Sequence, residues 1–403
     1  MRLVIFDDNK ESNFYPLTLN RSTGDLRVGI LKLRQRVAAY FEEEEYDMIV
    51  HKRLTRLTKE RHPKRRVNSL GKDEYLFVNS RLIINDDLAS TIRELPYASI
   101  LAKDSTVLAA RLELPEGEYY SEMLPEIFAK LTQKQLDLAE CWEFTWELIE
   151  NNAEYISNDF FDFFYEEDNF FDTELGVTIL NPYNAWIGDN ANLKPGVVID
   201  CSDGPVVIDE EVTIMHNSVI IGPVYIGKGS VIKAGATIYE GTSIGKKCKV
   251  GGEVEGTIIQ GYSNKQHSGF LGHAYIGEWV NIGAGTNNSD LKNNYRTVKC
   301  YFHPEKEIKD SGKQFLGTII GDHTKIGINC AINTGTVIGI GCNLYGSRLI
   351  KGHIPSFSWG ESGDLVSYQV ESFGETVKIV KGRRKLTMSE SEKELLTPNI
   401  TEQ

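Results

Sequence analysis

The sequence predicts two different folds in one chain, an α/β domain followed by a parallel β-helix built from repeats of six residues. The chain has 403 residues, which is more than the roughly 250–300 residues that one hydrophobic core usually serves. Short apolar runs alternate with helix-like segments up to about residue 180, as they do in α/β domains. Beyond that point an aliphatic residue recurs at every sixth position, which predicts a repeat structure.

Composition restricts the classes of protein to consider. Lys and Arg number 44 and Asp and Glu 57, giving a formal net charge of −13, which argues against general nucleic-acid binding. The six cysteines include no CxxC pair, so we predict no zinc site and a reducing compartment. The first residues do not resemble a signal peptide, and there is no apolar stretch of about 18 residues. We therefore expect a soluble cytoplasmic protein that binds no metal, nucleic acid or membrane.

The α/β domain is expected over residues 1–115. One of its helices is predicted at residues 31–44, and residues 116–182 are expected to form a mainly helical connector whose clearest segment is 144–155. The strands of the α/β domain are predicted at four apolar runs, Leu3–Phe6, Met48–Val50, Tyr75–Val78 and Leu82–Ile84.

The β-helix is expected over residues 183–356. A period of six matches neither a helix of period 3.6 nor a strand of period two, but it fits a triangular coil with one short strand on each side. The repeated aliphatic residue points inward, three hexapeptides close one coil, and coils stack about 4.8 Å apart. The longest series is Ile208, Ile214, Ile220, Ile226, Ile232, Ile238, Ile244 and Val250, and a second is Ile320, Ile326, Ile332, Ile338, Leu344 and Ile350.

The repeat changes phase twice. After Val250 it resumes at Phe270, which predicts about two extra residues in the coil that carries residues 261–269. The second break, at 288–319, is polar and lysine-rich, and we expect a loop there that leaves the coil. Residues 357–403 are expected to form a tail with a basic run at 381–385 and a short capped helix at 388–396.

A more specific pattern lies within the β-helix. It comprises KVGGEVEGTIIQGYSNKQHSGFLGHAYIGEWVNIGAGTNN (249–288) and GDHTKIGINCAINTGTVIG (321–339). These stretches resemble a divergent bacterial branch of the bifunctional N-acetylglucosamine-1-phosphate uridyltransferase / glucosamine-1-phosphate N-acetyltransferase family. The resemblance implies a left-handed β-helix, acetyl-CoA as cosubstrate, a sugar phosphate as acceptor, UDP-N-acetylglucosamine biosynthesis and a homotrimer.

The chemistry of N-acetylation needs a base, because the sugar ammonium must lose a proton before it attacks the thioester. A histidine that titrates near neutral pH suits this role. His267 lies in the first phase break, and the resemblance implies that it is the catalytic base. His273 is a competitor that we interpret as a turn residue.

Binding roles also follow from the resemblance. It implies that Gly283, Ala284 and Gly285 serve the coenzyme through backbone N–H groups, although corner glycines of the coil would look the same. Asn281 matches a substrate-binding position. The remaining substrate-binding candidates are the cations Lys265, Lys292 and Arg296, which suit a phosphate, and Phe270, which stands where the family has tyrosine.

The N-terminal part carries a weaker resemblance. Residues 14–33, FYPLTLNRSTGDLRVGILKL, resemble part of the nucleotidyltransferase domain, which implies nucleotide contacts by Arg21, Arg27 and Lys32. The preceding FDDNKES has no glycine to approach a triphosphate, and Thr23 stands where the family has its catalytic lysine. Mg²⁺ is therefore expected only if this domain is active. The basic run 52–66 is interpreted as a solvated loop.

Three functions remain open. The leading one is an acetyl-CoA-dependent N-acetyltransferase for an amino-sugar 1-phosphate behind a degenerate nucleotidyltransferase-like domain. The second is a bifunctional enzyme that also transfers a nucleotidyl group from UTP or dTTP to a sugar 1-phosphate. The third is a non-catalytic trimeric scaffold. The sequence does not decide the acceptor sugar, the acyl chain or the nucleotide.

Overall fold

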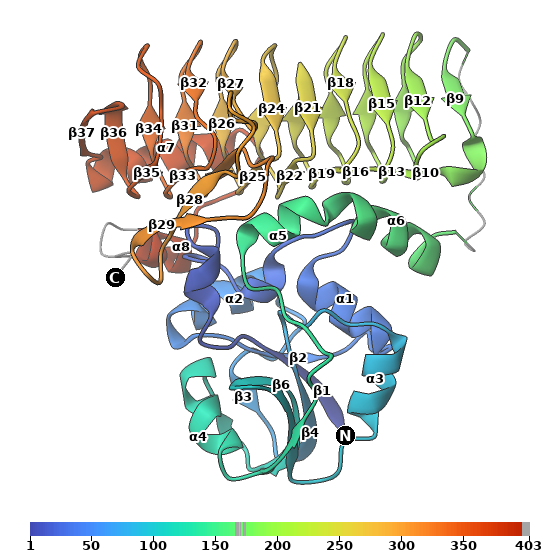
Figure 1. Ribbon diagram of the computed structural model, residues 1–403, viewed down its shortest axis with the longest axis vertical. Helices are drawn as coiled ribbons and strands as arrows, with labels where there is room; N and C mark the ends of the chain where they lie inside the picture. Colours follow the sequence, from blue (N-terminus) through green and yellow to red (C-terminus); the bar gives the residue numbers. More distant parts are fainter. Residues whose placement is uncertain (166–168, 170, 172–174, 397–403) are drawn as a thin grey trace.

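The computed structural model describes residues 1–165, 169, 171 and 175–396. Figure 1 shows a stack of coils above a compact α/β domain, with two helices lying between them. Parts of the expected connector (166–168, 170 and 172–174) and of the expected tail (397–403) lie outside the described residues.

The N-terminal domain is built on a mixed six-stranded sheet in the order β2-β1-β4-β6-β5-β8. Its strands are β1 (Arg2–Phe6), β2 (Asp47–Ile49), β4 (Asp73–Asn79), β5 (Ser99–Lys103), β6 (Thr106–Leu114) and β8 (Thr132–Gln135), with β3 (Ser69–Leu70) and β7 (Gly117–Glu118) paired at one side. Three of the four predicted strands are present. The fourth prediction was wrong: Leu82 makes only an isolated bridge to Cys141.

Helices cover this sheet and join it to the coils. They are α1 (Leu33–Tyr40), α2 (Thr55–Arg61), α3 (Asp86–Arg93), α4 (Leu124–Phe128), α5 (Thr145–Glu150) and α6 (Asn152–Phe163). Two expectations need correction here. Strand β8 pairs with β5, so the domain continues past residue 115 and the connector is not mainly helical. The basic run 52–66 contains α2 and is not a loop.

The β-helix consists of three parallel sheets. The inner sheet, which faces the N-terminal domain, contains β10 (Ala185–Ile187), β13 (Val206–Ile208), β16 (Val224–Ile226), β19 (Thr242–Ile244), β22 (Ile258–Ile259), β25 (Tyr275–Ile276), β30 (Thr318–Ile320), β33 (Thr336–Ile338) and β35 (His353–Ile354). The helix-side sheet contains β11 (Asn192–Leu193), β14 (Thr213–Ile214), β17 (Val231–Ile232), β20 (Lys249–Val250), β23 (Asn264–Lys265), β26 (Asn281–Ile282), β31 (Lys325–Ile326), β34 (Asn343–Leu344), β36 (Ser358–Glu361) and β37 (Asp364–Ser367). The outer sheet contains β9 (Thr178–Leu180), β12 (Val198–Asp200), β15 (Val219–Ile221), β18 (Thr237–Ile238), β21 (Glu253–Glu255) and β24 (Phe270–Gly272), and β27 (Asn287–Asn288) pairs with β32 (Ala331–Ile332) beyond it.

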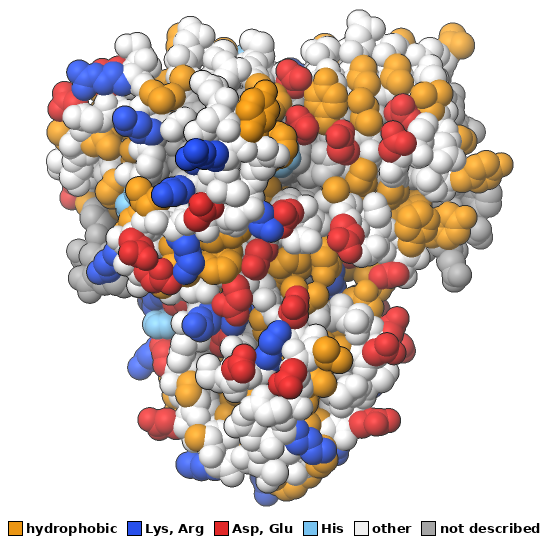
Figure 2. Space-filling model, in the orientation of Figure 1, with side chains coloured by type: hydrophobic (Ala, Val, Ile, Leu, Met, Phe, Trp, Pro, Cys, Tyr) orange, Lys and Arg blue, Asp and Glu red, His pale blue; other side chains and the backbone are white. Residues whose placement is uncertain are grey.

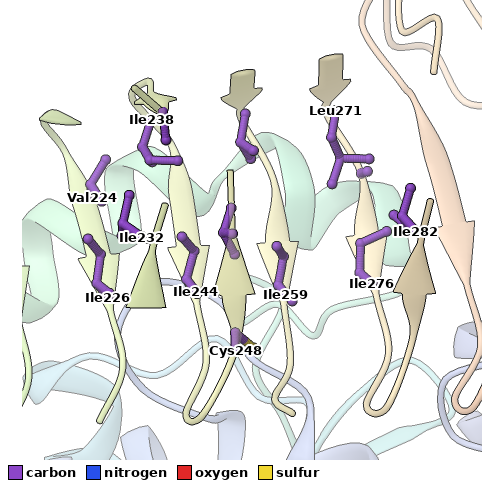
Figure 3. Packing of buried hydrophobic residues seen from close by; sticks show 14 of the residues in the cluster. Val224, Ile226, Ile232, Ile238, Ile244, Cys248, Ile259, Leu271, Ile276 and Ile282 are labelled. Carbon is purple, nitrogen blue, oxygen red and sulfur yellow. The ribbon is translucent and has the colours of Figure 1, made fainter. Parts of the chain in front are cut away.

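The period of six builds the core of this prism, as predicted. Ile208 pairs with Ile226, Ile214 with Ile232 and Ile220 with Ile238, each 18 residues further on. Figure 3 shows inward side chains of this core, among them Ile226, Ile232 and Ile238, stacked along the prism. Each fully buried isoleucine contributes about 1.5–3 kcal/mol, so the repeated row stabilises the stack.

The first phase break was misread from the sequence. Val250 pairs with Lys265, only 15 residues further on, so this coil is shorter and contains no insertion. The tight corner at Gly251 and Gly252 brings Val254 inward only four residues after Val250. The inward residue of β24 is therefore Leu271, which is 2% exposed, and Phe270 faces outward.

The second break does leave the coil, but it is not a free loop. It contains a hairpin of β28 (Lys299–Phe302) and β29 (Glu307–Asp310), which lies beside α5 between the coils and the N-terminal domain (Figure 1). Val298, Cys300 and Phe302 are buried in a cluster that includes Phe14 and Trp146. The hairpin therefore packs between the two domains and contributes to their shared hydrophobic contact.

The C-terminal segment folds back onto the coils. Helix α7 (Val370–Gly382), which the sequence analysis missed, ends inside the basic run. The predicted capped helix is confirmed as α8 (Glu390–Leu395), where the Ser389 hydroxyl accepts a hydrogen bond from the N–H of Glu392 at 3.1 Å. None of the helices in the described part of the chain is long and apolar enough to cross a membrane.

Candidate active site

His267 lies on an exposed corner between the helix-side and outer sheets, on the turn that joins β23 to β24. The next coil places Gly283, Ala284 and Gly285 at the same corner, and the Gly285 N–H donates to the Ser268 carbonyl at 2.9 Å. The structure therefore brings together the predicted base and the predicted cofactor-binding residues, because one coil stacks directly on the other.

Most of the N–H groups of the glycine turn already have partners. Gly283 donates to Ile326 O at 2.9 Å, and Gly285 donates to Ser268 O. A Cβ atom on Gly283 would lie 2.3 Å from Gly327 O, and Gly285 has a positive φ of +72°. Coil stacking therefore uses the N–H groups of Gly283 and Gly285, and a role of this turn, including Ala284, in binding the coenzyme stays a prediction.

Lys265 does not point towards a substrate cleft, contrary to the prediction. It occupies the inward position that aliphatic residues hold in neighbouring coils, and it is 3% exposed. Its Nζ donates to the carbonyls of Gly251 and His267, both at 2.9 Å. Lys265 therefore fixes the backbone of the His267 turn from inside the prism.

The buried Lys265 ammonium should make stability depend on pH. Burial lowers the pKa of Lys265 from 10.5 to about 8, so between these values the unfolded chain binds more protons than the folded chain. Stability rises with pH across this window. We expect the free energy of unfolding of the wild type, relative to Lys265→Met, to increase by about 3 kcal/mol from pH 8 to about pH 10.5. Urea unfolding measures it.

The matched control for this measurement is Lys351→Met, which changes an exposed lysine on the same β-helix. Its difference from the wild type should stay flat with pH. An equally flat difference for Lys265→Met would show that this ammonium is not buried in solution.

Asn281 lies in a cavity of about 400 Å³ between the helix-side sheet and α7. Gln266, the residue before His267, also lines it, so the cavity adjoins the His267 turn. The Asn281 backbone continues the ladder, with its Cα paired to those of Asn264 and Lys325. Of the residues that the structure describes, four cations line the cavity, Lys249, Lys325, Arg383 and Arg384, and no carboxylate residue does.

The charges in this Asn281 cavity repel one another. Burial and the neighbouring Arg384, Lys233 and Arg383 lower the pKa of Lys249. Lys325 donates to the carbonyls of Trp279 at 2.7 Å and His323 at 2.9 Å, and burial lowers its pKa to about 7. An anion would relieve the repulsion, so the cavity suits a phosphate or carboxylate.

The remaining predicted phosphate ligands do not gather around His267. The Lys292 ammonium donates to the Thr297 carbonyl of its own loop at 2.7 Å, and Arg296 is exposed on that loop. The loop begins after β27, at the corner between the outer and inner sheets. His273 lies at this corner and pairs with Asp290 at 2.8 Å. Figure 2 shows basic side chains on the part of the β-helix that carries the last coils and the hairpin, and more acidic and apolar ones at the opposite end.

Two of the three predicted nucleotide ligands, Arg21 and Arg27, contact the β-helix and hold the two domains together. Arg21 is buried in an ion pair with Asp322 of the β-helix and lies 3.6 Å from Glu278. The Arg27 N–H donates to the Tyr275 hydroxyl at 2.7 Å, and its guanidinium lies 4.9 Å from the ring centre of Tyr225. Lys32 lies 3.3 Å from Asp25. None of the three lines the cavity at the ends of β1 and β2, which is lined instead by acidic residues such as Asp8, Glu11 and Glu122.

Sequence reasoning missed Lys249 as a member of the site, whereas Arg383 and Arg384 belong to the basic run 381–385. A basic run in the tail was noticed, but its position depends on α7 packing against the helix-side sheet, where Arg384 donates to Asn264 at 3.0 Å. Among the described residues, no group of three or more His, Cys, Asp or Glu side chains is placed to hold a metal ion.

Comparison with known families confirms the resemblance in both parts of the chain. Residues 3–165 match the sugar nucleotidyl transferase family model, and residues 205–240 match the bacterial transferase hexapeptide model of six repeats. The N-terminal domain is thus similar to sugar nucleotidyl transferases, and the β-helix carries repeats similar to those of bacterial hexapeptide transferases.

More particular similarity is found among curated relatives. The chain is 34% identical over 177 residues to a bifunctional sugar-1-phosphate nucleotidylyltransferase/acetyltransferase of Sulfurisphaera tokodaii, covering 42% of this chain and 43% of that protein. It is 27% identical over 219 residues to the bifunctional protein GlmU of Thermotoga maritima, covering 46% of this chain and 42% of that protein. The chain therefore spans less than half the length of these relatives.

Among solved structures, a UDP-N-acetylglucosamine acyltransferase of Francisella novicida is similar over 53% of this chain and 72% of its own chain. The TM-score of that match is 0.31 and the sequence identity is 17%.

Proposed function

We propose that the chain is an acetyl-CoA-dependent N-acetyltransferase that acts on an amino-sugar 1-phosphate. The observation that carries the proposal is the cavity of Asn281, which adjoins the turn of His267 and, within the described ranges, is lined by cations without a carboxylate. The similarity to a sugar-1-phosphate nucleotidylyltransferase/acetyltransferase supports the choice of both substrates.

The proposed roles follow from position. His267 removes a proton from the acceptor ammonium, and the freed amine attacks the thioester carbonyl. As the carbon–sulfur bond breaks, His267 returns this proton to the leaving thiolate, and the second proton that the nitrogen loses on forming the amide passes to solvent. Lys249, Arg383 and Arg384 hold a phosphate of one substrate, in place of Lys265, whose ammonium is bonded inside the prism.

Thiol release tests the proposal directly. The full chain with acetyl-CoA and glucosamine 1-phosphate should liberate coenzyme A, while glucose 1-phosphate, which lacks the amine, should give none. Arg384→Gln should raise the KM of the substrate held in the Asn281 cavity about tenfold with little change in kcat. Lys385→Gln, an exposed change in the same basic run, is the control. No thiol release with any amino-sugar phosphate would refute the proposal.

A second candidate function is nucleotidyl transfer to a sugar 1-phosphate, which the family match over residues 3–165 favours. The cavity at the ends of β1 and β2 is acidic, so a triphosphate would have to enter it together with bound cations that offset the negative charge. Incubation with UTP or dTTP, glucose 1-phosphate and Mg²⁺, followed by measurement of pyrophosphate, decides whether this activity is present.

A further inference from the structure

A second cavity, the junction cavity, lies where the N-terminal domain, the β-helix and the C-terminal segment meet. Its volume is about 470 Å³, within the range of small-molecule sites. It adjoins the Asn281 cavity, because Tyr262 and Trp279 line both, with their rings stacked 4.4 Å apart. Six cations line it: Arg21, Lys32, Arg34, Arg61, Lys246 and Lys381.

Several of these cations already have carboxylate partners. Asp25 lies 3.3 Å from Lys32 and 2.9 Å from Arg34, and Lys381 pairs with Glu392. The Lys381–Glu392 pair is neutral, whereas Lys32 and Arg34 share one carboxylate and keep an excess of positive charge.

Two other cations of the junction cavity are not neutralised. Within the described part of the chain, neither Arg61 nor Lys246 forms an ion pair. Arg61 donates only to the Asn20 carbonyl at 2.8 Å, and the Lys246 ammonium lies 5.5 Å from the ring centre of Tyr262. Lys246 is exposed and reaches the cavity from the β-helix, whereas Arg61 reaches it from α2.

The lowered pKa of Glu278 reflects the same excess of positive charge. Burial alone would raise the pKa of this carboxyl, but Arg21, Arg61, Lys32 and Lys246 together outweigh burial and lower the pKa. Four carboxylates, those of Asp25, Glu60, Glu278 and Glu392, line the junction cavity against six cations, so a further anion would be attracted to the same place.

A buried donor supplies an independent sign of a missing partner. Arg21 is 2% exposed and lines the junction cavity, yet its Nε has no hydrogen-bond partner in the described structure. Buried donors are nearly always satisfied, so an unmet one at a cavity wall marks a place for an acceptor oxygen.

From these observations we propose that the junction cavity binds a small phosphate-bearing ligand, held by Arg21 and Arg61 of the N-terminal domain and by Lys246 of the β-helix. Guanidinium groups and an ammonium that converge from two domains suit the several oxygens of a phosphate. The volume leaves room for a group the size of a sugar ring beside it. Such a ligand would bridge the two domains and is separate from the anion in the Asn281 cavity.

Calorimetric titration of the full chain tests this proposal with three probes: inorganic phosphate, pyrophosphate and glucose 1-phosphate. None of these probes carries an amine to be acetylated, so binding does not depend on the proposed transferase activity. At least one probe should bind, and the one that binds best distinguishes free phosphate from a sugar phosphate. Arg61→Met and Lys246→Met should each weaken that binding about tenfold or more.

The controls separate the two cavities. Lys59→Met changes an exposed lysine on the same helix as Arg61 but outside the junction cavity, and it should bind like the wild type. The Asn281 cavity also suits a phosphate, so the titrations are repeated in Arg384→Met, which alters only that cavity and should keep the binding that depends on Arg61 and Lys246. The proposal is overturned if the wild type binds none of the probes. It is equally overturned if Arg61→Met and Lys246→Met bind as tightly as Lys59→Met, or if Arg384→Met alone abolishes all binding of the probes.

Discussion

Replacing His267 by alanine is expected to lower kcat for acetyl transfer by a factor between about 10² and 10⁴, the usual contribution of a general base. The side chain is exposed on a corner whose backbone is fixed by Lys265 and by the next coil, so the replacement should not disturb the fold. The KM values should change little, since the cations of the Asn281 cavity remain in place. Steady-state kinetics with thiol detection measures the effect.

The β-helix provides a matched control for this variant. His216 is an exposed histidine at the same kind of corner, between β14 and β15 of an earlier coil. His216→Ala should retain wild-type kcat. Equal activity of both variants would mean that His267 is not the base, and equal loss in both would point to damage to the coils instead of the chemistry.

Replacing Arg21 by methionine should destabilise the chain by about 3–5 kcal/mol, the usual cost of leaving one partner of a buried ion pair without the other. Arg21 crosses from the N-terminal domain to Asp322 of the β-helix, and both side chains are almost fully buried. Asp322 keeps only hydrogen bonds from Asn20 at 3.0 Å and from the Glu278 N–H at 2.8 Å. Urea unfolding followed by tryptophan fluorescence measures the loss.

The comparison variant for Arg21 is Arg56→Met, which breaks an exposed ion pair with Glu394. Surface pairs contribute about 1 kcal/mol or less, so this change should have a small effect. If Arg21→Met were no more destabilising than Arg56→Met, the contact between the domains would not be held by this buried pair in solution.

The β-helix could be predicted from the sequence because its rule is local. Each hexapeptide places one aliphatic residue inward, so the series from Ile208 to Val250 alone determines 18-residue coils. The prediction failed where a lysine, not an aliphatic residue, occupies the inward position. Lys265 was therefore assigned to a surface loop, and Phe270 was placed in the row that Leu271 fills.

The docking of the two domains was not predicted, although the sequence holds a signal for it. Outward positions of the inner sheet, such as Val207, Tyr225 and Tyr275, are apolar or aromatic and buried beneath the N-terminal domain and the hairpin. A repeat search attends only to the inward position and passes over this second row. The partners of Arg21 and Arg27 depend on that docking, so both looked like nucleotide ligands from the sequence alone.

The site was predicted in part for a similar reason. His267 and the glycine turn are 16 residues apart and meet because the coils stack, which the repeat already implied. The cations of the Asn281 cavity come from segments as distant as Lys249 and Arg384. Their meeting requires α7 to fold back over the helix-side sheet, and no local pattern encodes that contact.

The end of the helix-side sheet has a consequence for assembly. A stack of parallel strands finishes with unpaired N–H and C=O groups that another chain could extend, and repeat arrays need a terminator to remain discrete. Here β37 turns back and pairs antiparallel with β36, with Ser358 opposite Ser367 and Glu361 opposite Asp364. The last strand of the sheet therefore runs in the reverse direction. A neighbouring solenoid that continued the parallel register would meet a strand of the wrong polarity, so this sheet carries its own barrier to fibre growth.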